Sequence, residues 1–193
     1  MERLIAELYA GRPVLLPTDT VYGLVSRPSE AAVAALYELK GRRAEQPTAL
    51  LTASIEQLLE TIPELDDAPL RALLPGPFTL VLPNPGRRYV WLAGENPDAI
   101  GVRVPKLPET AHQVLAAVGA VAATSANDPG GPDPRELADV PERIRDACAA
   151  LDAGPLPGTP STVLDLTGPE PRVVREGAIA TKEALALLNR VAE

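Results

Sequence analysis

Short apolar runs alternate with stretches of helical periodicity along this chain, and the alternation limits its possible folds more than any other feature. The apolar runs have the length of buried strands, and turn-forming residues separate them from the helical stretches. Strands and helices are therefore expected to alternate through the chain. The expected strands cover residues 14–16, 48–52, 78–82, 100–104, 120–124, 161–166 and 172–175, and the expected helices cover residues 2–10, 30–40, 55–60, 111–118 and 181–191.

Residues suited to capping mark several of the expected helix ends. Gly11 follows the first helix in the manner of a C-cap, and Ser29 is well placed as the N-cap of the second. Ser54 and Gln57 have the spacing of a capping box at the start of the third. The second helix therefore delivers Lys40 to its carboxyl end.

The size and composition favour one soluble globular domain. A chain of 193 residues can bury a sizeable core without dividing into several domains. The apolar fraction is 46%, and no apolar run approaches the roughly 20 residues of a membrane span. The first residues lack the basic flank and apolar core of a signal peptide. We therefore expect a single domain over residues 1–193, with no membrane contact and a cytoplasmic location.

The composition also argues against several classes of site. One cysteine and one histidine allow no internal disulfide and too few soft ligands for zinc, so a structural metal is not expected. A net charge of −8 argues against a broad grip on a phosphate backbone, and an aromatic content of 3% argues against a base-stacking platform. Direct tRNA binding is thus expected to be weak or absent. The chain also lacks the P-loop, the Rossmann glycine fingerprint, the nucleophile elbow, and the HExxH and CxxC motifs.

Cations and hydroxyls stand where the expected elements end. Side chains at such positions converge over the edge of a sheet, so the set predicts a site for a polyanion such as ATP. The set comprises Thr18 in a Pro-Thr-Asp-Thr turn, Lys40 and Arg42 around a helix-ending glycine, Ser125 and Asn127 after a strand, and Arg103, Ser161 and Arg175 in or beside later strands.

Each of these residues also has a simpler structural interpretation. The segment around Thr18 is by itself more typical of a turn or a helix N-cap than of a substrate site. Lys40 and Arg42 can simply complement the negative end of a helix dipole. Arg103 is harder to explain in this way, because a buried guanidinium needs an anionic partner, either internal or bound. The acidic pair at 66–67, in contrast, is best explained as exposed surface.

Seven motifs of this chain occur in the order of one known family. In these motifs the chain resembles the YrdC family, the L-threonylcarbamoyladenylate synthases, over nearly its whole length, and it is similar to the short members that consist of the YrdC-like domain alone. The motifs are PTDTVYGL (17–24), KGR (40–42), PGPFTLVL (75–82), GVRVP (101–105), TSAN (124–127), STVLDL (161–166) and VVREGAI (173–179).

The resemblance implies an α/β fold in which a twisted open sheet with flanking helices surrounds a deep, positively lined cavity. It implies a nucleotidyltransferase that forms threonylcarbamoyl-AMP, pyrophosphate and water from L-threonine, bicarbonate and ATP, with Mg²⁺ on the phosphates. The product would supply the threonylcarbamoyl group of threonylcarbamoyladenosine in tRNA, through transient contact with a tRNA threonylcarbamoyl transferase complex.

The resemblance also implies roles for individual residues. The two cations of the KGR motif, Lys40 and Arg42, become the candidate catalytic residues, because phosphoryl-type transfer needs charge neutralisation more than a nucleophilic side chain. No metal-binding side chain is expected. The family's threonine-binding positions correspond to Thr18, Arg103 and Ser161, and its ATP-binding positions correspond to Lys40, Arg42, Ser125, Asn127 and Arg175.

The chain departs from the family pattern at four positions near the expected site. Arg43 replaces a proline after the KGR motif, and Gln46 replaces a residue that contacts ATP. Leu51 stands where some longer members have a histidine that contacts threonine, and Asp133 replaces a hydroxyl near the nucleotide. These departures concern individual phosphate and threonine contacts and leave the main set intact.

Two other functions remain open at the level of sequence. One is a carbamoyl-adenylate or nucleotide-binding enzyme of the same fold with a different amine or carbamoyl donor. The other is an RNA-binding or ribosome-associated module that uses the basic cavity, which salt-dependent tRNA binding without ATP turnover would reveal. Threonine-dependent release of pyrophosphate separates the expected synthase from both.

Overall fold

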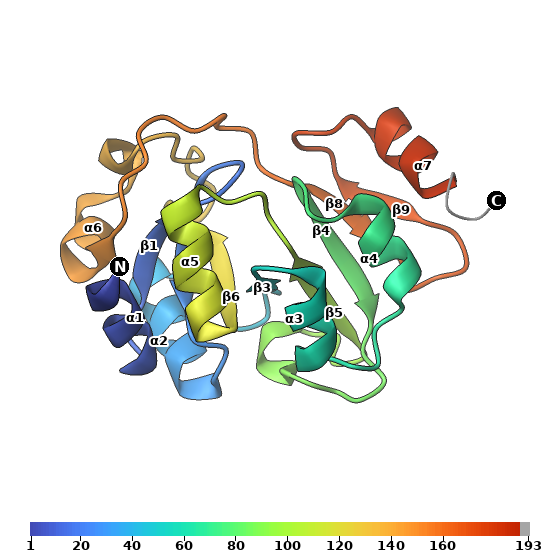
Figure 1. Cartoon of the computed structure of the whole chain (residues 1–193), viewed down its shortest axis with the longest axis horizontal. Coiled ribbons are helices and arrows are strands. Elements are labelled where there is room, and N and C mark those ends of the chain that lie inside the picture. The colour runs from blue at the N-terminus through green and yellow to red at the C-terminus, as the bar shows by residue number, and fades with distance from the viewer. Residues whose placement is uncertain (190–193) are drawn as a thin grey trace.

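One mixed sheet runs through the computed structural model, which describes residues 1–189 (Figure 1). The strand order is β7-β1-β2-β6-β3-β5-β4-β8-β9, with parallel pairs β1/β7, β3/β5 and β4/β8 and antiparallel pairs elsewhere. The expected α/β architecture is confirmed. The strands are β1 (Val14–Pro17), β2 (Tyr22–Ser26), β3 (Ala49–Thr52), β4 (Phe78–Pro83), β5 (Ala99–Arg103), β6 (Ala120–Ser125), β7 (Ala149–Ala150), β8 (Thr162–Asp165) and β9 (Arg172–Arg175).

Helices pack against both faces of this sheet. One core cluster joins α1 and α5 to strand residues such as Leu16 and Val25, whereas a larger cluster joins the remaining helices to their neighbours Leu15 and Leu24. Because alternate residues of a strand point to opposite faces, the two clusters lie on opposite sides of the sheet. The helices are α1 (Glu2–Tyr9), α2 (Glu30–Lys40), α3 (Ile55–Thr61), α4 (Asp67–Leu73), α5 (Glu109–Val118), α6 (Glu142–Ala147) and α7 (Thr181–Asn189), and single turns of 3-10 helix cover η1 (Val90–Leu92) and η2 (Leu137–Asp139).

The predicted caps explain where several helices begin and end. The hydroxyl of Ser29 accepts a hydrogen bond from the N–H of Ala32, at 3.4 Å, and that of Ser54 accepts one from Gln57, at 3.1 Å. Gly41 ends α2 with φ of 69°, a left-handed conformation that glycine adopts without strain. Lys40 is therefore the last residue of α2, as predicted. The expected closing helix is present as α7, and residues 190–191 of that prediction lie outside the described residues.

The sequence analysis does not predict β2, α4, α6 or β7. β2 is buried throughout and follows β1 after a tight turn at 18–21, so it shows neither an alternating pattern nor a separating loop. The N-cap of α4 is Asp66, whose carboxylate accepts a hydrogen bond from the N–H of Ala68, at 3.1 Å. Pro69 lies in its first turn, where an N–H has no helical partner to lose. The acidic pair thus lies on the surface, as expected, and it also starts a helix.

The segment between β7 and β8, coloured orange, crosses the molecule from the end near α6 to the end near β8 (Figure 1). It is tied down by Tyr22, whose hydroxyl lies 3.0 Å from Asp152 Oδ1 and accepts a hydrogen bond from the N–H of Ala153, at 2.9 Å. Further along, the N–H of Gly158 donates to the carbonyl oxygen of Thr20, at 2.9 Å. These contacts bind the crossing segment to β2 and to the turn before it.

None of the helices in the described residues combines the length and apolar character that a membrane span requires.

Candidate active site

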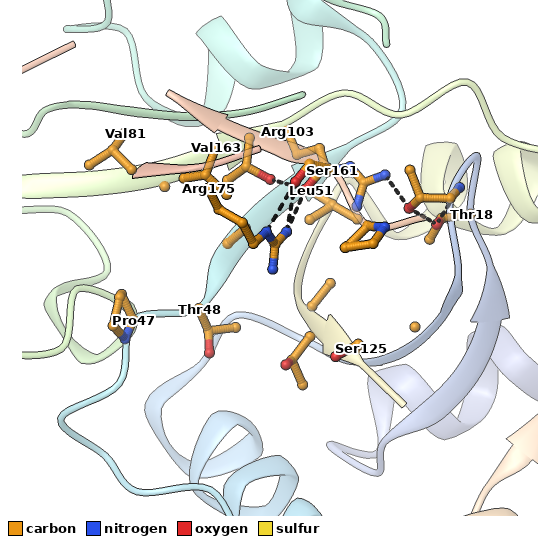
Figure 2. Close-up of a pocket in the computed structure, with 18 of the residues that line it drawn as sticks. Thr18, Pro47, Thr48, Leu51, Val81, Arg103, Ser125, Ser161, Val163 and Arg175 are labelled. Atoms are coloured by element: carbon orange, nitrogen blue, oxygen red, sulfur yellow. Dashed lines mark hydrogen bonds between the residues drawn. The ribbon is translucent and has the colours of Figure 1, made fainter. Parts of the chain in front are cut away.

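A cavity of about 380 Å³ lies over the middle of the sheet (Figure 2). Small residues form much of its floor, among them Gly23 in β2, Ala49 in β3, Gly101 in β5 and Ala123 in β6. Alternate strand residues face the same side, so these positions leave space on the sheet face. The volume falls within the range of about 300–1,000 Å³ typical of small-molecule sites.

The cavity wall carries both charge and hydroxyl groups. Guanidinium groups outnumber carboxylates among the described residues that line it, which suits an anionic ligand. In Figure 2, Arg175, Ser161, Arg103 and Thr18 lie along one side, and Pro47, Thr48 and Ser125 lie on the other. The charged lining residues are Arg42, Arg103, Arg175 and Asp133, and the hydroxyl-bearing ones are Thr18, Thr20, Thr48, Thr79, Thr124, Ser125 and Ser161.

The turn between β1 and β2 is organised by the Thr18 hydroxyl. This hydroxyl donates to the carbonyl oxygen of Val21, at 2.7 Å, and accepts from the N–H groups of Thr20 and Val21, both at 3.2 Å. The turn interpretation of Thr18 is therefore correct. Thr18 also lines the cavity, so the same residue belongs to the wall of the site.

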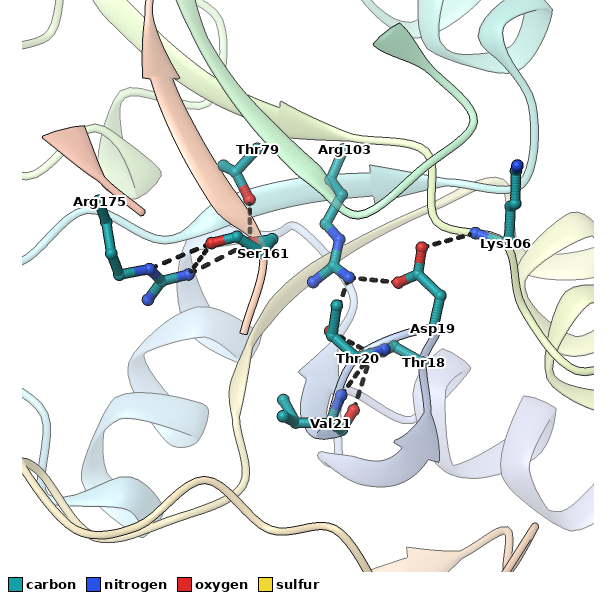
Figure 3. Close-up of polar contacts among 9 residues, drawn as sticks. All are labelled: Thr18, Asp19, Thr20, Val21, Thr79, Arg103, Lys106, Ser161 and Arg175. Atoms are coloured by element: carbon teal, nitrogen blue, oxygen red, sulfur yellow. Dashed lines mark hydrogen bonds and ion pairs between the residues drawn. The ribbon is translucent and has the colours of Figure 1, made fainter. Parts of the chain in front are cut away.

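Arg103 has an internal anionic partner, Asp19 (Figure 3). Its Nη2 donates to Asp19 Oδ1 and to Thr20 Oγ1, the latter at 2.8 Å. The second oxygen of Asp19 accepts from the N–H of Lys106, at 3.0 Å, so the carboxylate is fixed from two sides. Burial lowers the pKa of the Arg103 guanidinium, and Asp19 opposes that shift. The guanidinium stays charged, because arginine is not deprotonated in proteins.

Arg103 keeps unused hydrogen-bonding capacity. Its Nε is buried and has no partner within the described residues. The guanidinium has five N–H donors, and Asp19 and Thr20 take only those of one nitrogen. Since Arg103 lines the cavity, its remaining donors are available to an anion without breaking the pair with Asp19.

Ser161, Thr79 and Arg175 form a second polar group in the cavity wall (Figure 3). The hydroxyl oxygens of Ser161 and Thr79 are 2.8 Å apart. Arg175 Nη2 donates to the carbonyl oxygen of Ser161, at 2.8 Å, and lies 3.2 Å from its hydroxyl. A Cβ on Gly177 would lie 2.2 Å from the carbonyl oxygen of Pro160, so only glycine allows this close approach beside Ser161.

The end of α2 sends Arg42 into the cavity. The N–H of Arg42 donates to the carbonyl oxygen of Tyr37, at 2.9 Å, which closes the helix end after the left-handed Gly41. Arg42 Nη2 donates to the carbonyl oxygen of Pro47, at 2.6 Å, while its Nε is buried without a partner among the described residues. Arg42 therefore combines a fixed position with spare donors.

Lys40 and Asn127 lie behind the cavity wall, outside the set of lining residues. The ammonium of Lys40 donates to the carbonyl oxygens of Ser125 and Asn127, at 2.6 and 2.7 Å, and to Asn127 Oδ1, at 2.7 Å. An ammonium has three protons, so all of them are used. Ser125 Oγ donates to the same Asn127 Oδ1, at 2.7 Å. Lys40 thus fixes the strand end that carries Ser125 into the cavity.

Comparison with known proteins assigns this fold to a family. The sequence model of the Sua5/YciO/YrdC family, described as "Telomere recombination", matches residues 6–177. The chain belongs to this family. The resemblance inferred from the seven motifs is therefore confirmed.

Members of the Sua5/YciO/YrdC family with similar sequences carry related names. A protein of Mycobacterium tuberculosis (strain ATCC 25618 / H37Rv), named putative threonylcarbamoyl-AMP synthase, is 35% identical over 191 residues, covering 96% of this chain and 87% of that protein. A protein of Alkalilimnicola ehrlichii, named threonylcarbamoyl-AMP synthase, is 37% identical over 194 residues, covering 95% and 92%. Both names refer to the relatives themselves.

A solved structure of the family has the same fold. The crystal structure of P. abyssi Sua5 complexed with L-threonine superimposes with a TM-score of 0.83 at 32% sequence identity. The match covers 95% of this chain and 55% of that one, so this chain spans about half the length of P. abyssi Sua5. The YrdC-like sheet with flanking helices, expected from the sequence, is confirmed.

The structure brings most of the predicted site residues of this YrdC-like chain together around one cavity. Six of them line the cavity, and Lys40 and Asn127 support it from behind. Of the departures from the family pattern, Leu51 and Asp133 line the cavity, whereas Arg43 and Gln46 are exposed and do not. The six lining residues are Thr18, Arg42, Arg103, Ser125, Ser161 and Arg175.

Sequence reasoning missed two side chains that shape the site. Asp19 stands in the quoted PTDT turn, but no role was assigned to it, because its pairing with Arg103 spans 84 residues. Thr79 lies on β4 inside the PGPFTLVL motif, and its hydroxyl meets Ser161. A polar residue that alternates with apolar ones on a strand was the signal available for Thr79.

Proposed function

We propose that this protein forms threonylcarbamoyl-AMP and pyrophosphate from L-threonine, bicarbonate and ATP. The observation that carries the proposal is the cavity, which three guanidinium groups and several hydroxyls from distant parts of the chain line together. A site for an amino acid and a triphosphate needs both kinds of group. The names of the family members, and the threonine complex of P. abyssi Sua5, support the choice of substrates.

Threonine is proposed to bind between Arg103, Thr18 and Ser161. The free donors of Arg103 suit the threonine carboxylate, and Asp19 keeps the guanidinium oriented. The hydroxyls of Ser161 and Thr79 lie beside Leu51 and other apolar residues of the wall. A side chain that carries one hydroxyl and one methyl group fits such a mixed surface.

ATP is proposed to bind along Arg42, Ser125 and Arg175. The first and last of these side chains supply charge, and Ser125 supplies a hydroxyl, so together they neutralise and orient the triphosphate. Lys40 and Asn127 belong to the same proposed set. Because all three Lys40 protons are used, direct contact with a phosphate requires one internal acceptor to be exchanged for a phosphate oxygen.

Mg²⁺ would enter with the phosphates of ATP. This ion prefers oxygen ligands and keeps several water molecules, so it needs few protein groups. In the described part of the chain, no group of three or more His, Cys, Asp or Glu side chains is arranged to hold a metal ion. Asp133 is the carboxylate among the described lining residues, and it is our candidate for contact with the metal or its water shell.

The proposed chemistry uses no nucleophilic side chain. The neutral amine of threonine attacks the carbon of bicarbonate, which forms the N–C bond of a carbamate and releases water. A carbamate oxygen then attacks the α-phosphorus of ATP, and the bond to the bridging oxygen of pyrophosphate breaks. Negative charges meet in this step, so catalysis depends on positioning and on charge neutralisation by Arg42 and Lys40.

The product would then pass to a tRNA threonylcarbamoyl transferase complex through a transient contact. A mixed anhydride of a carbamate and AMP is prone to hydrolysis, so rapid transfer to that complex is favoured. Direct contact with tRNA is not required of this chain, which carries a net charge of −8. Since ATP and tRNA are cytoplasmic, we propose that the reaction takes place there.

Pyrophosphate release tests the proposal. With ATP, Mg²⁺ and bicarbonate present, L-threonine should stimulate release at least about tenfold over the rate without an amino acid, since threonine supplies the carbamate nucleophile. Omitting bicarbonate should remove the stimulation. ATP turnover that does not depend on threonine would point to a related enzyme with another amine, and tRNA binding without turnover would point to an RNA-binding module.

Lys40 makes the proposed ATP site sensitive to pH. Burial lowers the pKa of its ammonium from 10.5 to about 8, and Arg42 and Arg143 act in the same direction, while Asp133 and Asp128 oppose them. ATP binding should therefore weaken as the pH rises from 7 to 9, because a neutral Lys40 loses its charge and one donor.

The stability of the free protein should respond to Lys40 in the opposite direction. The pKa in the unfolded chain is the higher one, so between about pH 8 and pH 10.5 the unfolded state binds more protons. Deprotonation of Lys40 thus raises the free energy of unfolding over that interval. Calorimetric titration of ATP and thermal melts at several pH values measure both effects. Lys40→Met cannot titrate and should flatten the ATP profile, and an unchanged profile in that variant would contradict the prediction.

A further inference from the structure

Arg143, on the short helix α6, contacts two segments that the sequence separates widely. Its Nη1 donates to the carbonyl oxygen of Leu39, and its Nη2 lies 3.2 Å from that of Lys40, both at the carboxyl end of α2. The same Nη2 donates to Asp128 Oδ1, in the residue that follows the TSAN motif. One guanidinium therefore bridges the end of α2 and the segment that leaves β6.

The position of Arg143 is fixed by the core. Its neighbour Ile144 is fully buried, so α6 is held against the protein at this point. The carboxyl end of a helix carries partial negative charge and unpaired carbonyl groups, which favour a guanidinium. Arg145, two residues further along the same helix, is half-buried and donates to the carbonyl oxygen of Ala138, at 3.3 Å. The two arginines thus have different surroundings although they share a helix.

The two segments that Arg143 joins are the ones that carry the proposed ATP end of the cavity. Lys40 ties them together from the inside, through the carbonyl oxygens of Ser125 and Asn127. Arg143 ties them together from the outside, through the carbonyl oxygen of Lys40 and through Asp128, the residue after Asn127. Arg42 and Ser125, which face the cavity, project from these two segments.

We propose that Arg143 is a positioning residue for ATP: together with Asp128 it sets the distance between the end of α2 and the TSAN segment. It acts through Arg42 and Ser125 and touches no substrate itself. The inference rests on the proposed function, since it concerns the ATP end of the same cavity.

The expected effect is moderate. The side chains of Arg143 and Asp128 are 48% and 57% exposed, and exposed ion pairs contribute little by themselves. The helix-end contacts add to the pair, so we expect Arg143→Ala to weaken ATP binding about 3- to 10-fold. The Michaelis constant for threonine should change less than about twofold, because Arg103 and Ser161 lie at other strand ends.

Calorimetric titration of the full-length protein with ATP tests the proposal. Arg143→Ala should bind ATP more weakly than the wild type, whereas Arg145→Ala, the matched variant on the same helix, should bind it equally well. Asp128→Asn should weaken binding in the wild type but add little in the Arg143→Ala background. Equal ATP affinity in the two arginine variants would overturn the proposal.

A second readout tests whether Arg143 and Asp128 lie beside Lys40 in solution. The charged groups that act on Lys40 are Arg42, Arg143, Asp128 and Asp133. Removing Arg143 should move the pH at which ATP binding weakens upward, and Asp128→Ala should move it downward. Both charges act on Lys40 only if the bridge holds them beside it, so an unchanged pH in the two variants would also overturn the proposal.

A third measurement keeps the inference separate from the proposed function. If wild-type protein binds no ATP, the proposed function fails. Amide hydrogen exchange in the free protein then tests the bridge directly. Exchange at Ser125 and Asp128 should be faster in Arg143→Ala than in Arg145→Ala, and equal exchange would contradict the role of Arg143.

Discussion

L-Valine should release pyrophosphate with a kcat/KM about 10⁴-fold or more below that of L-threonine, and L-serine should fall only about 10- to 200-fold below it. Thr18 and Ser161 are 4% and 3% exposed. Valine would place a methyl group against these buried hydroxyls, where threonine can form hydrogen bonds with them. A missing methyl group, in contrast, loses only apolar contact with residues such as Leu51. The order threonine, serine, valine thus follows from the composition of the wall.

L-allo-Threonine is the matched control for this series. It carries the same hydroxyl and methyl groups with exchanged positions, so it tests their placement and not their presence. We expect its kcat/KM to lie between those of serine and valine. Initial rates of pyrophosphate release at fixed ATP and bicarbonate measure all four. Valine within tenfold of threonine would show that the cavity does not recognise the hydroxyl group.

Arg103→Ala should raise the Michaelis constant for threonine about 100-fold or more while leaving that for ATP within a few-fold. The variant loses the donors proposed for the threonine carboxylate. It also leaves Asp19 buried without its partner, which should lower the free energy of unfolding by about 3–5 kcal/mol. The separation between the two substrates is the essential part of the prediction.

A second variant guards against a failure to fold. Asp19→Asn combined with Arg103→Gln replaces both charges with amides, so no isolated buried charge remains. The Michaelis constant for threonine should still rise strongly in this double variant. Its thermal midpoint of unfolding should be higher than that of Arg103→Ala. Arg88→Ala is the control, because Arg88 pairs with Glu64 on the surface, at 2.8 Å, away from the cavity. A folded Arg103 variant with unchanged threonine use would remove this residue from the site.

Local sequence patterns predicted most of the fold, because helix caps and the spacing of apolar residues depend on neighbours within the same segment. Ser29 and Ser54 cap helices where expected, and the apolar runs form strands. β2 (Tyr22–Ser26) was not predicted, because it is buried on both faces and begins directly after a turn. α4 was not predicted, because its N-cap, Asp66, has the sequence context of an ordinary exposed acidic residue. Periodicity says which side of an element is buried, but it does not say which segment will cover it.

The site shows the same division between local and distant information. The motifs supplied the cavity residues, but the partners that orient them come from elsewhere in the chain. Asp19 meets Arg103, and Arg143 meets Asp128 and the end of α2, through contacts that no pattern within one segment records. Lys40 shows what local sequence cannot predict. It lies behind the cavity wall because its ammonium binds carbonyl oxygens 85 and 87 residues away.

The wall of the cavity has a consequence for how the protein is made. Thr18 and Arg175 face the same space although about 160 residues separate them, and a ribosome adding about 5–20 residues per second needs roughly 8–30 s to pass from one to the other. Throughout that interval the nascent chain contains the turn with Thr18 but lacks the later strands that form the rest of the cavity. Activity should therefore arrive late in translation and in a single step, when the last strands join the sheet.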